Sequence, residues 1–108
     1  MIEQERQPMK ELIGSVKAWA ADRKILQNST APAQLLKTMS ELGELADAIA
    51  KGDQEETIDG IGDVLVTLII VAALRGLEIE DCLRSAYNEI KDRRGYLSAA
   101  GVFVKETA

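Results

Sequence analysis

Residues 40–66 read SELGELADAIAKGDQEETIDGIGDVLV and hold two pairs of carboxylates at helical spacing. Glu41 and Glu44 are three residues apart, and Asp59 and Asp63 are four apart. Side chains at these spacings share one face of a helix. The segment between the pairs is short and contains Gly52, a residue type that often ends helices. The stretch therefore predicts two antiparallel helices whose acidic faces meet at a similar height.

Apolar side chains recur at helical spacing through most of the remaining chain. Leu12, Val16 and Trp19 define one such face, with Ile13 and Ala20 beside it. We expect helices over about 8–24, 32–50 and 53–74, and a fourth that begins near residue 81 and ends at residue 95. Residues 26–31 read as a polar loop. The weakly patterned tail, 96–108, contains an apolar run at 102–104 that is expected to dock on the body or on a partner.

The composition is that of one small globular domain. The chain has 108 residues, of which 46% are hydrophobic and 29% charged. Aromatic residues make up only 4%, so the core must consist mainly of aliphatic side chains. With two prolines and no alternating strand pattern, the sequence favours an all-α fold. We predict a single domain over 1–108, with its core at about 8–95.

The charged and metal-binding residue types limit the possible functions. The net charge is −5, which argues against nucleic-acid binding led by phosphate contacts. The chain has no histidine, which excludes histidine general bases and histidine-ligated zinc, and its one cysteine rules out an internal disulfide. Any metal must be held by oxygen atoms, which suits Mg²⁺ or Mn²⁺.

The location is inferred from the hydropathy pattern. The first residues, MIEQERQPMKELI, are charged and lack the apolar segment of a signal peptide. The longest apolar run, 64–74, is shorter than the roughly 17–25 residues that a membrane-spanning helix needs. We therefore expect a cytoplasmic protein without membrane contact.

The helix expected at 53–74 is apolar on nearly every side after Asp63. A helix of that kind must be surrounded by other elements. Three short helices can hardly cover it, so we predict an oligomer, either a homodimer or a homotetramer.

The four carboxylates adjoin these apolar surfaces, and like charges near a low-dielectric core need neutralisation. Glu41 alone has a basic residue at pairing distance, which is Lys37. A divalent cation would neutralise all four, although acidic pairs on helices are often merely solvated. Gly60 and Gly62 flank the aspartates and suggest that a helix or a ligand approaches the backbone there.

Beyond these acids, the sequence resembles the MazG-like nucleotide pyrophosphohydrolases of the all-α NTP pyrophosphatase superfamily. The similarity lies in the ExxE pattern at 41–44, in the acidic pair that leads into "DVL" at 63–65, in residues 19–49, and in "AYNEIKDRRG" at 86–95. It covers roughly residues 12–95. The family pattern after the hairpin is ExxD, but Gly60 stands three residues before Asp63. Asp59 looks like the replacement, whereas Glu56 with Asp59 would also satisfy ExxD.

The resemblance implies a four- to five-helix bundle that hydrolyses a nucleoside triphosphate to a monophosphate and pyrophosphate with Mg²⁺, for which Mn²⁺ is a possible substitute. It implies three catalytic carboxylates, four metal ligands and five substrate contacts. The catalytic set is Glu41, Glu44 and Asp63. The metal ligands are Glu41, Glu44, Asp59 and Asp63. The substrate contacts are Lys37, Asn88, Lys91, Arg94 and Trp19.

Two other interpretations of the sequence remain open at this stage. The departure at Gly60 is compatible with a non-catalytic helical oligomer that serves as an interaction or nucleotide-sensing protein. Trp19 is also compatible with a core position, and Lys91 and Arg94 with stabilisation of a helix end by cations. The preferred base and sugar do not follow from the sequence.

Overall fold

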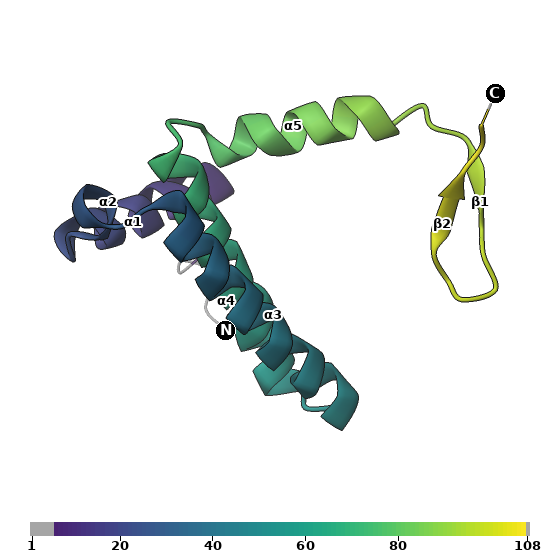
Figure 1. Cartoon of the computed structure of the whole chain (residues 1–108), viewed down its shortest axis with the longest axis horizontal. Helices are drawn as coiled ribbons and strands as arrows, with labels where there is room; N and C mark the ends of the chain where they lie inside the picture. The colour runs from purple at the N-terminus through teal and green to yellow at the C-terminus, as the bar shows by residue number, and fades with distance from the viewer. Residues whose placement is uncertain (1–5, 108) are drawn as a thin grey trace.

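Two long antiparallel helices form the centre of the fold (Figure 1). The structure is a computed structural model and describes residues 6–107. The predicted domain's outermost residues, 1–5 and 108, lie outside this range. The helices are α1 (Met9–Asp22), α2 (Ile25–Asn28), α3 (Ala31–Lys51), α4 (Gln54–Leu74) and α5 (Ile79–Ile90), and the strands are β1 (Gly95–Leu97) and β2 (Phe103–Lys105). The all-α class predicted from the sequence is confirmed, apart from this small hairpin.

The α3–α4 pair is defined by capping residues at each end. The side chain of Thr30 accepts a hydrogen bond from the backbone N–H of Ala33 at the start of α3, where proline occupies the first turn. Gly52 ends α3 with φ 70°, a left-handed conformation that costs glycine little. Asp53 then accepts a hydrogen bond from the N–H of Glu56 at 3.0 Å and starts α4. The turn is therefore short enough to hold the two helices antiparallel.

The core lies where α1 and α2 cross the upper half of the α3–α4 pair (Figure 1). Its buried side chains are small or aliphatic: Ile13, Ala20, Ile69, Ile70 and Ala72. Ala48 is also buried, but it lies in the last turn of α3, near the connection to α4. On α1 the expected face is rotated, because Ile13 and Ala20 are buried while Leu12 and Trp19 are almost half exposed. The small side chain of Ala20 allows α1 to approach its neighbours closely, which leaves Trp19 at the edge of the core.

Helix α4 is incompletely covered within one chain. Thr67, Ile69, Ile70 and Ala72 are buried, but Ile58, Ile61 and Leu65 are about half exposed or more. By length and composition α4 could cross a membrane, with a mean hydropathy of 2.0 over its most apolar window, 28% of which is buried. It packs along α3 and carries Asp59 and Asp63, and ionised residues are costly in a bilayer. We interpret α4 as a core helix with one uncovered side.

Helix α5 and the hairpin project away from the rest of the protein, and we call residues 79–107 the arm (Figure 1). The arm packs mainly against the end of α4. The fourth helix ends at Ile90 instead of residue 95, and the tail forms an antiparallel hairpin in which Tyr96 pairs with Val104. The predicted polar loop at 26–31 was also partly wrong, because α2 occupies its first half.

The projecting arm makes the chain extended. Its radius of gyration is 16.6 Å, whereas a compact domain of this length has about 13 Å. The expected bundle therefore forms only in part within one chain: α1 to α4 pack together, and α5 contacts them at one end.

Candidate functional site

Glu41 is buried on α3, at the boundary between the core and the open side of the α3–α4 pair. It is 7% exposed and is the one buried carboxylate in residues 6–107. Lys37, one turn earlier on the same helix, places its Nζ 3.1 Å from Oε1 of Glu41. The pairing expected from the sequence is thus confirmed. Because a buried carboxylate requires a neutralising partner, Glu41 is positioned to interact with a cation.

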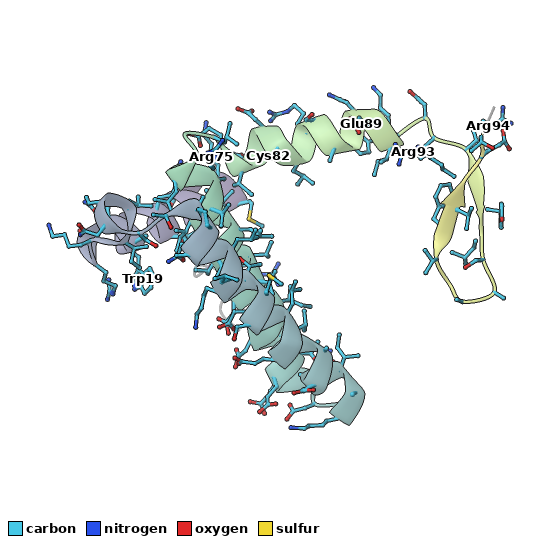
Figure 2. All side chains as sticks on the ribbon, in the orientation of Figure 1. Trp19, Arg75, Cys82, Glu89, Arg93 and Arg94 are labelled. Atoms are coloured by element: carbon cyan, nitrogen blue, oxygen red, sulfur yellow. The ribbon has the colours of Figure 1, made fainter. Side chains whose placement is uncertain are left out.

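A strongly acidic pocket lies beside Glu41, between the C-terminal half of α3 and the N-terminal half of α4. It has a volume of about 310 Å³. Its charged lining residues are Glu44, Asp47, Lys51, Glu56, Asp59 and Asp63, and Gly60 also lines it. Oxygen-bearing side chains gather along this edge of the helix pair in Figure 2. Five carboxylates against one lysine give the pocket a negative potential that attracts cations.

A second pocket of about 410 Å³ adjoins the first and has a different character. It is lined by Trp19 and Ile25, by the polar side chains of Gln34, Lys37, Glu41, Asp63 and Thr67, and by Val66 and Ile70. Asp63 lines both pockets. The guanidinium carbon of Arg23 lies 4.6 Å above the centre of the Trp19 ring. A ligand with an aromatic part and an anionic part could contact the Trp19 ring and the Lys37 ammonium group in this second pocket.

Two contacts between α3 and α4 fix the position of one helix along the axis of the other. A Cβ at Gly60 would lie 3.0 Å from Cδ1 and 3.2 Å from Cα of Leu45, so glycine permits the close approach. The hydroxyl groups of Thr38 and Thr67 lie 2.8 Å apart and are both buried. A larger residue at position 60 would press on Leu45 and require α3 or the Leu45 side chain to shift.

The donor set fits a hard divalent cation. Within residues 6–107, no three potential ligand side chains converge closely enough to form a ready-made metal cluster. Carboxylate oxygens nevertheless surround one open pocket, and Mg²⁺ characteristically takes one or two carboxylates and completes its shell with water and substrate oxygens. Glu56 and Asp59 both line that pocket, so the choice between them as the third ligand stays open.

The predicted substrate contacts fall into two groups. Lys37 and Trp19 line the pocket that contains Glu41. Asn88 lies on α5, and Arg94 lies beyond it at the far end of the arm, where Figure 2 labels Arg93 and Arg94 well away from Trp19. Lys91 caps the C-terminal end of α5. A single chain therefore does not bring these three residues of the arm to the acidic pocket.

Some features of the site were not predicted from the sequence. Trp19 was considered as a base-stacking residue, but its contact with Arg23 was not foreseen. Gln34 lines the Trp19 pocket, and no feature of the sequence indicated this. The hydroxyl pair of Thr38 and Thr67 has one visible signal, which is a threonine inside the most apolar stretch of the chain.

The fold and pockets define a helical protein with an acidic, cation-attracting cleft beside an aromatic pocket. The chain belongs to the family of the MazG nucleotide pyrophosphohydrolase domain, whose model matches residues 30–97. It is 38% identical over 64 residues to an uncharacterized 18.2 kDa protein from the rep-hol intergenic region of Haemophilus phage HP1. That match covers 59% of this chain and 39% of the phage protein, so the chain spans about two-fifths of that relative.

A solved structure shares the fold. It is a cyanophage S-2L MazG-like pyrophosphohydrolase bound to dGDP and three catalytic Mn²⁺ ions per active site. The superposition has a TM-score of 0.71 and covers 94% of this chain and all of the other, at 19% sequence identity. The likeness supports the overall helical fold.

Proposed function

We propose that this protein is a divalent-metal-dependent nucleoside triphosphate pyrophosphohydrolase, which converts an NTP or dNTP to the monophosphate and pyrophosphate. The observation that carries the proposal is the pair of adjoining pockets that share Asp63. One has the carboxylates to bind cations and the other has a ring and a lysine suited to a nucleotide. Membership of the MazG family and the cyanophage enzyme's dGDP and Mn²⁺ support this assignment.

The second pocket is suited to the nucleoside and the first phosphates. Its volume of about 410 Å³ falls within the range of small-molecule sites. Trp19 would stack on the base, and its half-exposed ring is accessible for that purpose. Lys37 would form a charge-assisted hydrogen bond to a phosphate oxygen. The phosphate chain would then extend past Asp63 into the acidic pocket.

The acidic pocket would hold the metal. Glu44, Asp59 and Asp63 line this pocket and Glu41 lines the adjoining one, so these four proposed ligands meet at the boundary that Asp63 shares. Mg²⁺ is the preferred ion and Mn²⁺ a substitute. A bound divalent cation withdraws charge from phosphate oxygens and lowers the pKa of a bound water. In the overall reaction a water oxygen bonds to one phosphorus, the bridging P–O bond of the anhydride breaks, and one proton is released. Glu41, Glu44 and Asp63 are the proposed catalytic carboxylates.

We further propose a homo-oligomer, either a dimer or a tetramer. The chain exposes 8427 Å², whereas a folded monomer of 11.8 kDa exposes about 5,900 Å². The excess is roughly 2,500 Å² per chain, or about 5,000 Å² for two chains, which lies at the upper part of the range of total area that obligate dimers bury. Much of the exposed apolar surface belongs to α4 and to the arm, where Leu83 and Tyr87 are 72% and 58% exposed.

In such an oligomer the arm of one copy would lie against the α3–α4 pair of another. The end of the arm carries Lys91, Arg93 and Arg94, and the acidic pocket has the complementary charge. This arrangement would supply Asn88, Lys91 and Arg94 as phosphate contacts from the second copy. A cytoplasmic location is also proposed, since the one cysteine, Cys82, is free and exposed, as suits a reducing compartment.

The test is a panel of NTPs, dNTPs and modified nucleotides incubated with Mg²⁺, with Mn²⁺ or with a chelator. We expect equal amounts of monophosphate and pyrophosphate from at least one nucleotide, and only with metal. Asp63→Asn should lower kcat by a factor of about 100 or more, because it removes a charged group shared by both pockets. Glu55→Gln is the matched control, since this exposed carboxylate lies on the same helix but outside the pocket lining.

Two results would contradict the proposal. One is release of orthophosphate alone, which would indicate cleavage of the terminal phosphate. The other is tight binding of a nucleotide and metal without turnover, which would instead support the nucleotide-sensing alternative.

A further inference from the structure

The hydroxyl groups of Thr38 on α3 and Thr67 on α4 form a buried hydrogen bond between the two helices that carry the acids. Their oxygens are 2.8 Å apart, and the two residues are 3% and 5% exposed. The Thr67 hydroxyl also lies 2.8 Å from the backbone oxygen of Val64, and the Thr38 hydroxyl lies 3.1 Å from that of Gln34. Each hydroxyl has a single proton. The arrangement that forms both 2.8 Å bonds has Thr67 donating to Val64 and Thr38 donating to Thr67.

This hydrogen bond is one helical turn from the proposed site. Thr38 precedes Glu41 by three residues, and Thr67 follows Asp63 by four, so each threonine shares a face with one of these acids. On the other side of the acids, Gly60 contacts Leu45. The second contact is apolar and non-directional, and helices joined only by such contacts can slide. The threonine pair adds a directional bond that fixes the height of Glu41 relative to Asp63.

We propose that Thr38 and Thr67 are positioning residues, whose hydrogen bond holds Glu41 and Asp63 at the relative height that metal binding requires. This rests on the function proposed above. Thr67 also lines the Trp19 pocket, so the same bond connects the geometry of the acids to the wall of the proposed nucleotide site. Groups that hydrogen-bond directly to metal ligands change metal affinity or activity by about 10- to 100-fold when they are removed. The threonine pair acts on the ligands only through the helix positions, so we take about tenfold, the lower end of that range.

The test compares two double variants with opposite expectations. Thr38→Val with Thr67→Val keeps the volume and removes both hydroxyls, so no buried partner is left unsatisfied and stability changes little. Thr38→Ser with Thr67→Ser keeps the hydroxyls and loses two buried methyl groups, so the melting temperature falls. We expect the valine variant to bind Mn²⁺ about tenfold more weakly and the serine variant to bind it almost as well as the original protein.

Mn²⁺ binding is measured directly, by calorimetry or electron paramagnetic resonance without nucleotide, alongside the Mn²⁺ concentration that half-activates pyrophosphate release. Thr57→Val is the matched control, because Thr57 is also on α4 and donates to the Asp53 oxygen at 2.7 Å, without a bond to α3. It should leave Mn²⁺ affinity unchanged. A purely structural role predicts that affinity follows the melting temperature, with the serine variant weaker than the valine variant.

The outcomes separate this inference from the proposed function. If the original protein binds Mn²⁺ and releases pyrophosphate while the valine variant matches it in both, the positioning role is overturned and the proposed function stands. If the original protein neither binds Mn²⁺ nor releases pyrophosphate, both are overturned.

Discussion

The ammonium nitrogen of Lys37 lies 3.1 Å from a carboxylate oxygen of Glu41, and the two residues differ sharply in exposure. The side chain of Lys37 is 60% exposed and that of Glu41 is 9% exposed. The carboxylate is therefore held in place by packing, whereas the lysine is free to turn toward a ligand in the pocket that both residues line. A fixed carboxylate such as Glu41 is suited to bind a metal ion, and a mobile ammonium group such as that of Lys37 is suited to bind a phosphate group of the substrate.

Replacing Lys37 with methionine should therefore weaken substrate binding and also lower stability. We expect KM to rise about tenfold, since one charge-assisted hydrogen bond contributes about 1.5–3 kcal/mol. The melting temperature should also fall, because the substitution leaves the buried carboxylate of Glu41 without its cation. Lys17→Met is the control. Lys17 forms an ion pair with Glu78 at an N–O distance of 2.9 Å, and neither residue lines the two pockets. An unchanged KM would show that Lys37 does not bind the substrate and serves only as the ion-pair partner of Glu41.

Gly60 and Gly62 should respond to alanine in opposite directions, although both lie in α4. A Cβ at Gly62 meets nothing within 4 Å, so Gly62→Ala should stabilise the helix by about 0.5–1 kcal/mol. A Cβ at Gly60 would lie 3.0–3.2 Å from Leu45, and overpacking of this kind costs about 1–3 kcal/mol. Gly60→Ala should thus be destabilising overall. Urea unfolding of both variants measures the difference, and equal stabilisation would show that the helices separate easily at this point.

Trp19 is the single tryptophan of the chain, so its fluorescence reports directly on the proposed nucleotide pocket. Addition of a nucleotide should quench the emission, because a base would stack on the ring. Trp19→Phe should retain most activity, and Trp19→Ala should raise KM about tenfold, since base–aromatic stacking contributes about 1–3 kcal/mol. If inorganic triphosphate, which has no base, quenches the emission equally well, base stacking on Trp19 is contradicted and the pocket binds the phosphate chain instead.

The arm should determine the oligomeric state. Leu83→Glu introduces a charge on the exposed apolar face of α5 and should shift the protein toward monomers in sedimentation velocity. Ser85→Glu alters the polar side of the same helix and should leave the assembly unchanged. A Leu83→Glu protein with the original mass would show that the arm is not part of the interface.

Mixed oligomers test whether the arm also completes the site. Neither Asp63→Asn nor the double variant Lys91→Ala with Arg94→Ala should be active alone. Oligomers that contain both kinds of chain should regain activity, because an intact arm can then meet an intact acidic pocket. Co-expression with two affinity tags isolates these mixtures, and inactivity in them would place the arm's contacts within one chain.

The local structure of this fold was largely predictable from the sequence. Thr30, Gly52 and Asp53 define the ends of α3 and α4, and each acts through its own side chain or backbone preference. The helical spacing of the acids likewise placed Asp59 and Asp63 together on one pocket. Such features depend on residues within a few positions of one another, which is why pattern and spacing were enough.

The parts that were missed depend on contacts between distant segments. Spacing did not show that Glu41 and Glu44 would line different pockets. The difference arises because Trp19 of α1 lines the pocket that contains Glu41 and not the pocket that contains Glu44. Periodicity correctly indicated an amphipathic helix at α5 but did not indicate that its apolar face would lie uncovered in a single chain. The hairpin was missed because each strand is only three residues long.

The arm has one attachment to its own body, at the end of α4, and its apolar side chains are open to solvent. If a second copy covers them, chains that have not yet associated leave these side chains exposed and lack the partner's contribution to the proposed site. At low copy number the dispersed chains would be both idle and vulnerable to proteases, so turnover would begin only once synthesis outpaced degradation.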